Sequence, residues 1–243
     1  MTFPATDGIT DRLQALFAYD ASSPLIFSSG LFLFLFAGFL LVYSVFRRAP
    51  MARIVYVIAF SLYFYYKSSG IYFLLLVFAA ASDFLIARGI FRTRSKSLKR
   101  WLMVLSVAVN LGMLGYLKYT GMFIDVLNRV CGALGFALRL PQVDILLPVG
   151  ISFFTFQALG YMIDVYKGRT KAETNLFRYA LFISFFPQLV AGPIERSNRL
   201  LRQLAEPHDF DFRRARDGLL IMLLGFFEKV VIADLAAIYV NAI

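Results

Sequence analysis

The sequence has only one cysteine and one histidine in 243 residues, and each scarcity excludes a class of site. The single cysteine, Cys131, allows no internal disulfide and no cysteine-based metal cluster. The single histidine, His208, cannot form a multi-histidine site, so we expect no bound metal. Charged residues are also scarce, at 16% against about 25% in ordinary soluble domains, which disfavours a typical soluble protein.

Apolar residues, by contrast, are abundant, at 60% of the chain with a mean hydropathy of +0.70. Several segments approach the roughly 20 apolar residues that cross a bilayer. These segments are Leu25–Phe46, Ile54–Tyr66, Ile71–Ile90, Trp101–Tyr119, Ile145–Tyr166, Leu176–Ile194 and Gly218–Ile243. The pattern predicts an all-α, polytopic membrane protein built as a bundle of transmembrane helices. Residues 1–24 are predicted to form an extracytoplasmic N-terminal segment, and residues 25–243 the transmembrane domain.

The net charge of +10 is distributed in a way that favours a membrane over nucleic acid. Basic residues cluster in alternate loops between the apolar segments, and no nucleic-acid recognition motif accompanies them. The loops rich in basic residues are Arg47–Arg53, Arg88–Arg100, Lys167–Arg178 and Arg196–Arg216. We therefore expect these loops to be cytosolic, the N-terminus to lie outside, and no nucleic-acid partner.

The stretch "FFPQLVAGPIERSNRL", Phe185–Leu200, conflicts with a simple crossing. If Leu176–Ile194 spanned the bilayer, the arginines that follow it would lie on the wrong side of the membrane. A re-entrant segment that breaks at Pro187 and Pro193 and returns to the cytosolic side removes the conflict. Irregular backbone at membrane depth is tolerated only where it is buried in protein or lines a wet cavity, so the prolines predict an enclosed polar chamber.

Polar residues inside the apolar segments are the candidates for function. Gln157, Tyr161 and Asp164 lie at i, i+4 and i+7, on one face of a helix. Alternatively, Gln157 and Tyr161 hydrogen-bond neighbouring helices, and Asp164 caps the cytosolic end near Lys167.

Two further titratable residues favour structural interpretations. Asp83 has a candidate neutralising partner in Arg88, so a structural role is favoured. His208 lies in the polar turn "AEPHDFDF", which is typical of a solvated or capping histidine and lacks catalytic geometry.

Three blocks of the sequence resemble a known family. They are "LLPVGISFFTFQALGYMIDVYKG", "FISFFPQLVAGPIER" and "GLLIMLLGFFEKVVIAD". Together they resemble the bacterial branch of the membrane-bound O-acyltransferases, which includes proteins of alginate O-acetylation, peptidoglycan O-acetylation and teichoic acid D-alanylation. The resemblance implies a core of transmembrane and re-entrant helices that passes an acyl group, here proposed to be acetyl, from a cytosolic donor to a hydroxyl of an exported polysaccharide or cell-wall component.

The resemblance also implies a set of core residues, partners and a location. Together with the helical spacing noted above, which contributes Tyr161 and Asp164, it gives the residues expected to line the core or tunnel: Gln157, Tyr161, Asp164, Pro187, Gln188, Gly192, Pro193 and Arg196. No cofactor is expected to be bound, and the acyl donor would be acetyl-CoA or the thioester of an acyl carrier protein. A multi-pass protein of the bacterial inner (plasma) membrane is implied, together with a periplasmic or extracellular transferase partner.

The chain departs from the family in its length. Family members are much longer, and their catalytic histidine lies in the later half, which would fall beyond Ile243. The chain is thus expected to be an N-terminal part, truncated at its C-terminus, without the catalytic residue and inactive by itself. Two other functions stay open at this point: a transporter or channel with a binding site near the bilayer midplane, and a non-catalytic fragment.

Overall fold

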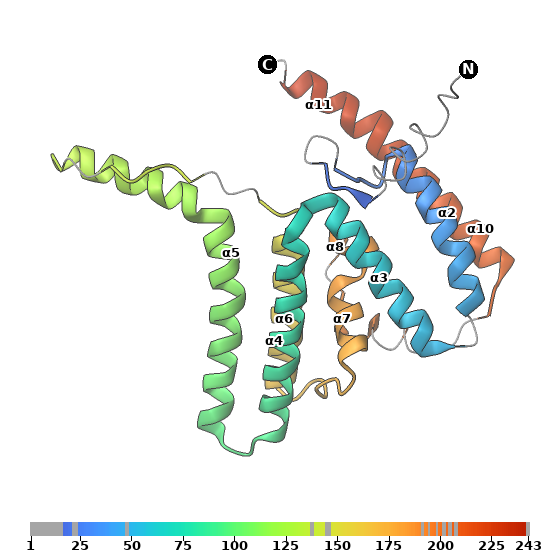
Figure 1. Ribbon diagram of the computed structural model, residues 1–243, viewed down its shortest axis with the longest axis horizontal. Helices are drawn as coiled ribbons and strands as arrows, with labels where there is room; N and C mark the ends of the chain where they lie inside the picture. Colours follow the sequence, from blue (N-terminus) through green and yellow to red (C-terminus); the bar gives the residue numbers. More distant parts are fainter. Residues whose placement is uncertain are drawn as a thin grey trace, which may run out of the picture. The chain divides into compact units, whose positions relative to one another are not determined.

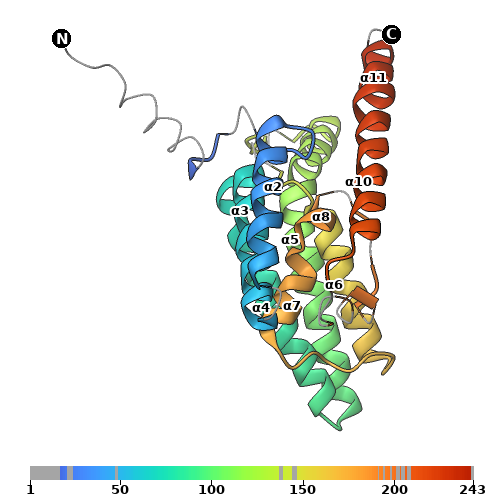
Figure 2. The same cartoon turned by 90° about the vertical axis from the view of Figure 1, so that its right-hand side faces the viewer.

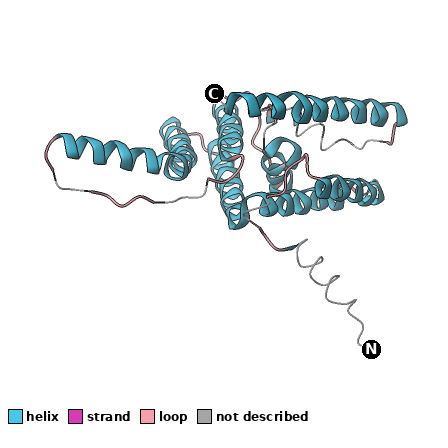
Figure 3. Cartoon of the chain, turned by 90° about the horizontal axis from the view of Figure 1, so that it is seen from above, coloured by secondary structure: helices cyan, strands magenta, loops and turns pink. Residues whose placement is uncertain are grey.

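The computed structural model describes residues 17–20, 24–46, 49–136, 139–143, 147–190, 192–193, 195–197, 199–200, 203, 206 and 209–241. Within these ranges every regular element is helical and no strand occurs (Figures 1 and 3). The all-α prediction is therefore confirmed for the described part of the chain. Contacts divide the chain into two compact units, Met1–Pro24 with Ile54–Ala205, and Leu25–Arg53 with Glu206–Ile243.

The larger unit holds most of the helices. They are α3 (Pro50–Ser69, from Ile54 onward), η2 (Gly70–Tyr72), α4 (Phe73–Arg92), α5 (Lys96–Ala133), α6 (Ile151–Tyr166), α7 (Leu176–Ser184) and α8 (Phe186–Leu189). Side-chain caps begin two of them: Ser95 accepts a hydrogen bond from the N–H of Leu98, and Asn175 accepts from Phe177 and Arg178. Such caps satisfy N–H groups that have no partner inside the helix.

The corner between α3 and α4 depends on Gly70. Its φ of +60° lies in the left-handed region, which glycine adopts without steric cost. A Cβ at this position would lie 2.9 Å from Cε1 of Tyr19, so the ring closes the corner. The sequence predicted the two flanking apolar segments, and the structure extends them into helices that meet at this glycine.

Helix α4 forms the centre of the unit and packs against α5, α6 and α7. The core between them is made of large apolar side chains that are almost completely buried, including Phe154, Met162, Tyr179 and Phe182. Apolar side chains also cover the outside: Leu85 is 67% and Trp101 69% exposed.

The spans Pro50–Arg92 and Lys96–Ala133 are long and apolar enough to cross a membrane. Together with the apolar outer surface, these spans suit a lipid environment.

Helix α5 is longer than the apolar pattern indicates. The apolar segment predicted from the sequence, Trp101–Tyr119, covers only part of it, because the helix continues to Ala133. Its outer part turns away from α4 (Figure 1), and the hydroxyl of Thr120, bonded to the Tyr116 carbonyl oxygen at 2.5 Å, favours such a bend. The Asn128 side chain pairs with the Leu140 backbone at 3.0 and 2.8 Å, so residues 139–143 run back beside the helix (Figure 3).

The second unit contains α2 (Gly30–Val45), α10 (Phe212–Phe227), the π-helical turn η3 (Glu228–Ala233) and α11 (Asp234–Asn241). The last three follow one another as a single long helix (Figure 2). The Asp211 side chain caps its start, where Oδ1 accepts the N–H groups of Arg213 at 2.9 Å and Arg214 at 3.3 Å. An ion pair between Lys229 and Asp234 bridges the π turn and the next helix. The predicted apolar segment from Gly218 is thus the later part of a helix that begins six residues earlier.

Candidate functional site

The helical segment formed by α7 and α8 is broken at Phe185, two residues before Pro187, the first of the two prolines singled out in the sequence. Phe185 has ψ of 107°, an extended value, and α8 restarts at Phe186 with Pro187 in its first turn. An uninterrupted helix would pair the N–H of Phe186 with the carbonyl oxygen of Phe182. The break separates these two groups, and each is buried and needs a new partner.

Side chains from two other helices supply those partners. Nε2 of Gln157, on α6, donates to the Phe182 carbonyl oxygen at 2.7 Å. The hydroxyl of Ser61, on α3, accepts the N–H of Phe186 at 3.2 Å and is completely buried. Gln157 was expected from the sequence, whereas Ser61 was missed; its only signal is a hydroxyl inside the apolar run "IAFSLYFYY".

Hydrogen bonds hold the segment that follows α8 to Gln188. Nε2 of Gln188 donates to the carbonyl oxygen of Pro193 at 2.7 Å, and its Oε1 lies 3.4 Å from Nε2 of Gln157. The N–H of Gly192 donates to the Gln188 carbonyl oxygen at 3.0 Å, and a Cβ on Gly192 would come within 2.5 Å of the Gln188 Cα. This close approach explains the glycine, and the hydrogen bonds explain the amide.

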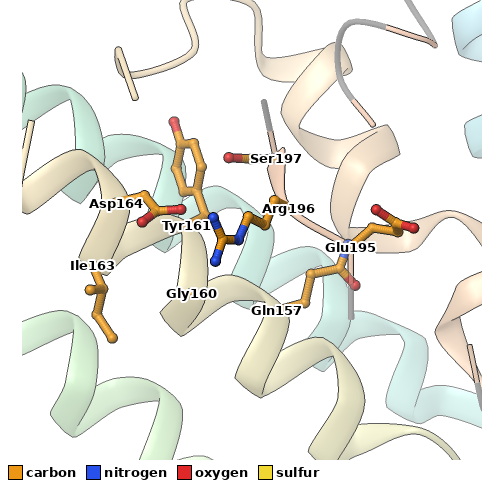
Figure 4. A pocket seen from close by; sticks show the side chains of 8 residues that line it. All are labelled: Gln157, Gly160, Tyr161, Ile163, Asp164, Glu195, Arg196 and Ser197. Carbon is orange, nitrogen blue, oxygen red and sulfur yellow. The ribbon is translucent and has the colours of Figure 1, made fainter. Parts of the chain in front are cut away.

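A cavity of about 270 Å³ lies between α6 and the segment that follows α8. Its lining residues are Gln157, Gly160, Tyr161, Ile163, Asp164, Glu195, Arg196 and Ser197 (Figure 4). Four of the eight residues proposed from the sequence are therefore brought together here, from α6 and from the segment that follows α8. The other four, Pro187, Gln188, Gly192 and Pro193, form the bend that leads to the cavity.

The cavity carries charged and polar groups on opposite walls. On α6, Asp164 forms an ion pair with Arg169 at 3.6 Å, so its partner is not Lys167. The Tyr161 hydroxyl accepts the N–H of Glu173 at 2.8 Å, which ties the loop after α6 to the cavity wall.

On the facing segment, Arg196 is exposed and forms no ion pair within the described part of the chain. Ser197 is 2% exposed, and its hydroxyl has no hydrogen-bond partner among the described residues. Figure 4 shows Arg196 extending toward α6. A guanidinium group and a buried hydroxyl on one wall suit an anionic or carbonyl-bearing ligand.

His208 and Ile194 lie outside the described residues. Within the described ranges, no group of three or more His, Cys, Asp or Glu side chains is arranged to hold a metal ion.

Comparison with known proteins gives three informative relatives. Over 219 residues the chain is 36% identical to the probable alginate O-acetylase AlgI of Pseudomonas aeruginosa, covering 88% of this chain and 41% of AlgI. Over 240 residues it is 30% identical to the peptidoglycan O-acetyltransferase of Helicobacter pylori, covering 86% and 45%. Over 131 residues it is 25% identical to the teichoic acid D-alanyltransferase of Lacticaseibacillus rhamnosus, covering 53% and 28%. No family model and no solved structure matches.

These relatives are acyl-transferring enzymes by name, which favours an acyltransferase over a transporter or channel. The chain belongs to the bacterial branch of the membrane-bound O-acyltransferases, and the resemblance read from its three sequence blocks is confirmed. It spans less than half the length of these curated relatives.

Proposed function

We propose that this chain is part of a membrane-bound O-acyltransferase of the bacterial inner membrane. The complete enzyme moves an acyl group, which we propose to be acetyl, from a cytosolic donor to a hydroxyl of an exported polysaccharide or cell-wall component. The observation that carries the proposal is the 36% identity to an alginate O-acetylase along 88% of the chain. The 30% identity to a peptidoglycan O-acetyltransferase supports the reaction type and leaves two classes of acceptor.

The topology we propose is multi-pass, with Phe185–Arg196 as a re-entrant element. Two observations support it: the helix breaks at Phe185, and polar side chains take up both backbone groups that the break releases. Such a break is tolerated at membrane depth only where protein or a wet cavity surrounds it. The arginines after the turn then stay cytosolic, as the alternation of basic loops requires.

The cavity beside Arg196 would receive the acyl end of the donor. Cavities for whole small-molecule ligands measure about 300–1,000 Å³, so one of about 270 Å³ suits a thioester and part of its phosphopantetheine arm. Acetyl-CoA and an acyl carrier protein share this arm, and Arg196 is placed to bind its phosphate or carbonyl oxygens. The catalytic base is proposed to lie outside this chain, as is a periplasmic or extracellular transferase partner.

The test is acyl transfer by the full-length protein with Arg196→Gln. Charge-assisted hydrogen bonds contribute about 1.5–3 kcal/mol, so the KM for the donor should rise about tenfold or more. Arg199→Gln is the matched control, because Arg199 is exposed on the same segment and does not line the cavity. No transfer of acetyl by the wild-type protein would refute the proposed function, and equal KM values for the two variants would refute the donor site.

A further inference from the structure

Gly160 forms the middle of the cavity wall on α6. It lies about one turn after Gln157 and one turn before Asp164, and all three residues line the cavity (Figure 4). A Cβ built on Gly160 meets no atom within 4 Å among the described residues. The space beside this glycine therefore belongs to the cavity, and no side chain from the described part of the chain fills it.

Neither of the usual structural reasons for a glycine applies at this position. Glycine lowers the stability of a helix interior relative to alanine, and Gly160 lies inside a helix of 16 residues. Gly150, at the start of the same helix, has a φ of +78°, and a carbonyl oxygen of α8 lies only 2.2 Å from its added Cβ. The φ of Gly160 is not in the left-handed region, and no backbone in the described ranges approaches it closely. An added side chain would occupy the cavity itself.

The two ends of the cavity differ in charge and burial. Asp164 pairs with Arg169 in the loop after α6, which is cytosolic in the proposed topology. Gln157 lies about 10 Å further along the helix axis, at about 1.5 Å per residue, and is 4% exposed. A donor that enters from the cytosol passes Asp164 first, so its acyl end reaches Gly160 and Gln157. The buried hydroxyl of Ser197, which has no partner among the described residues, is available to donate to the acyl carbonyl oxygen.

We propose that Gly160 sets the size of the acyl group that the cavity accepts. The acyl chain lies against the bare backbone of α6 at this residue, so an added methyl group and a longer acyl chain compete for the same space. Gly160 is thus a specificity-determining residue for short acyl groups. The inference rests on the proposed function, because it takes the cavity to be the donor site.

The test is Gly160→Ala in the full-length protein, with binding measured for an acetyl and a butyryl donor analogue. Each analogue is a thioether that cannot transfer its acyl group, and each is made on CoA and on pantetheine 4′-phosphate, the arm that CoA shares with carrier proteins. The readout is the Kd of the butyryl analogue divided by that of the acetyl analogue. One methylene in an apolar pocket changes discrimination by about 10- to 200-fold, so this ratio should rise about tenfold or more above its wild-type value.

The ratio separates acyl selection from folding. A partly unfolded sample has fewer binding sites but the same ratio of Kd values. Alanine at residue 160 should leave the free energy of unfolding unchanged or raise it, because its Cβ meets no atom of the described chain and alanine favours the helix. Gly160→Leu, which fills more of the cavity, should weaken binding of the acetyl analogue itself by about tenfold or more.

Gly112→Ala is the matched control. Gly112 lies inside α5, its added Cβ also meets no atom within 4 Å among the described residues, and it does not line the cavity. This substitution should leave the ratio at its wild-type value.

Four outcomes would overturn the inference. An unchanged ratio in Gly160→Ala would show that the acyl group does not lie at this residue, and an equal rise in Gly112→Ala would show that the effect is not local. A lower free energy of unfolding in Gly160→Ala would assign the glycine to close packing of a further helix. Failure of the wild-type protein to bind any analogue would remove the donor site. A wild-type protein whose ratio depends on Gly160 but that transfers no acetyl group would refute the proposed function and leave the role in acyl size intact.

Discussion

The break at Phe185 leaves the Phe182 carbonyl oxygen and the Phe186 N–H without a helical partner. We predict that removing the side chains that replace those partners gives non-additive losses of stability. Gln157→Leu removes the donor that reaches the Phe182 carbonyl oxygen at 2.7 Å, and Ser61→Ala removes the acceptor for the Phe186 N–H at 3.2 Å. A buried group left unpaired costs about 1–3 kcal/mol, whereas polar contacts between membrane helices average about 0.6 and reach about 1.7 kcal/mol. We expect each single substitution to lower the free energy of unfolding by about 1–2 kcal/mol.

The double substitution should cost less than the sum of the two. With both side-chain partners gone, the N–H of Phe186 can pair with the carbonyl oxygen of Phe182 if ψ of Phe185 moves from 107° to a helical value. Helices α7 and α8 would then join through a kink at Pro187, because proline cannot continue a straight helix. The coupling should reach about 0.5 kcal/mol or more, within the usual range for residues in one network. The assay is unfolding of the full-length protein in mixed detergent micelles.

Ser82→Ala is the matched control for the cycle. The Ser82 hydroxyl, on α4, donates to the carbonyl oxygen of Ala79 within the same helix, at 3.0 Å. Its cost should therefore add to that of Gln157→Leu. Additive costs for Ser61→Ala and Gln157→Leu as well would refute the argument that these side chains hold the two ends of one broken hydrogen bond.

Three further outcomes follow from the structure and the proposed topology. Cysteines at Ser95 and Asn198, in a background without Cys131, should resist an impermeant reagent added outside intact cells; modification of either contradicts the cytosolic loops. Gly150→Ala should destabilise the protein for two reasons. Its φ of +78° should cost about 1–2 kcal/mol, and overlap of the added Cβ with a carbonyl oxygen of α8 only 2.2 Å away should cost about 1–3 kcal/mol. An unchanged free energy of unfolding would contradict that contact. Surface polysaccharide from cells that express the 243-residue chain alone should carry no added acetyl, as measured by acetyl release from the polysaccharide. Acetylation that His208→Ala abolishes would make that histidine the base.

The sequence was sufficient for the features that depend on local chemistry. Apolar runs located the helices, and two spans are long and apolar enough to cross a membrane. Pro187 located the break to within a few residues, because proline removes a backbone donor. The i, i+4, i+7 spacing placed Gln157, Tyr161 and Asp164 on one face, and all three line the cavity.

Hydrogen bonds between residues far apart in the sequence could not be predicted from local patterns. Ser61 bonds a backbone group 125 residues away, and no local pattern distinguishes it from other hydroxyls in apolar segments. Asp83 was assigned the nearest basic residue on its own helix, but its partners lie 23 and 27 residues along the chain, on α5. The extent of α5 was underestimated because polar residues after Tyr119 resemble the end of a span, whereas the helix continues past them to Ala133.

The bend and the cavity share residues, and this sharing changes how substitutions are interpreted. Gln157 lines the cavity and also holds the Phe182 carbonyl oxygen, so the structural and functional interpretations of its sequence position are both satisfied by one side chain. Lower activity after changing Gln157 therefore reports the bend and the cavity together. Arg196 lines the same cavity, but among the described residues its side chain forms no hydrogen bond with the bend. A change in activity after substitution of Arg196 therefore reflects the cavity alone. A donor KM that rises for Arg196→Gln without a change in unfolding would assign the cavity to ligand binding, whatever holds the break in place.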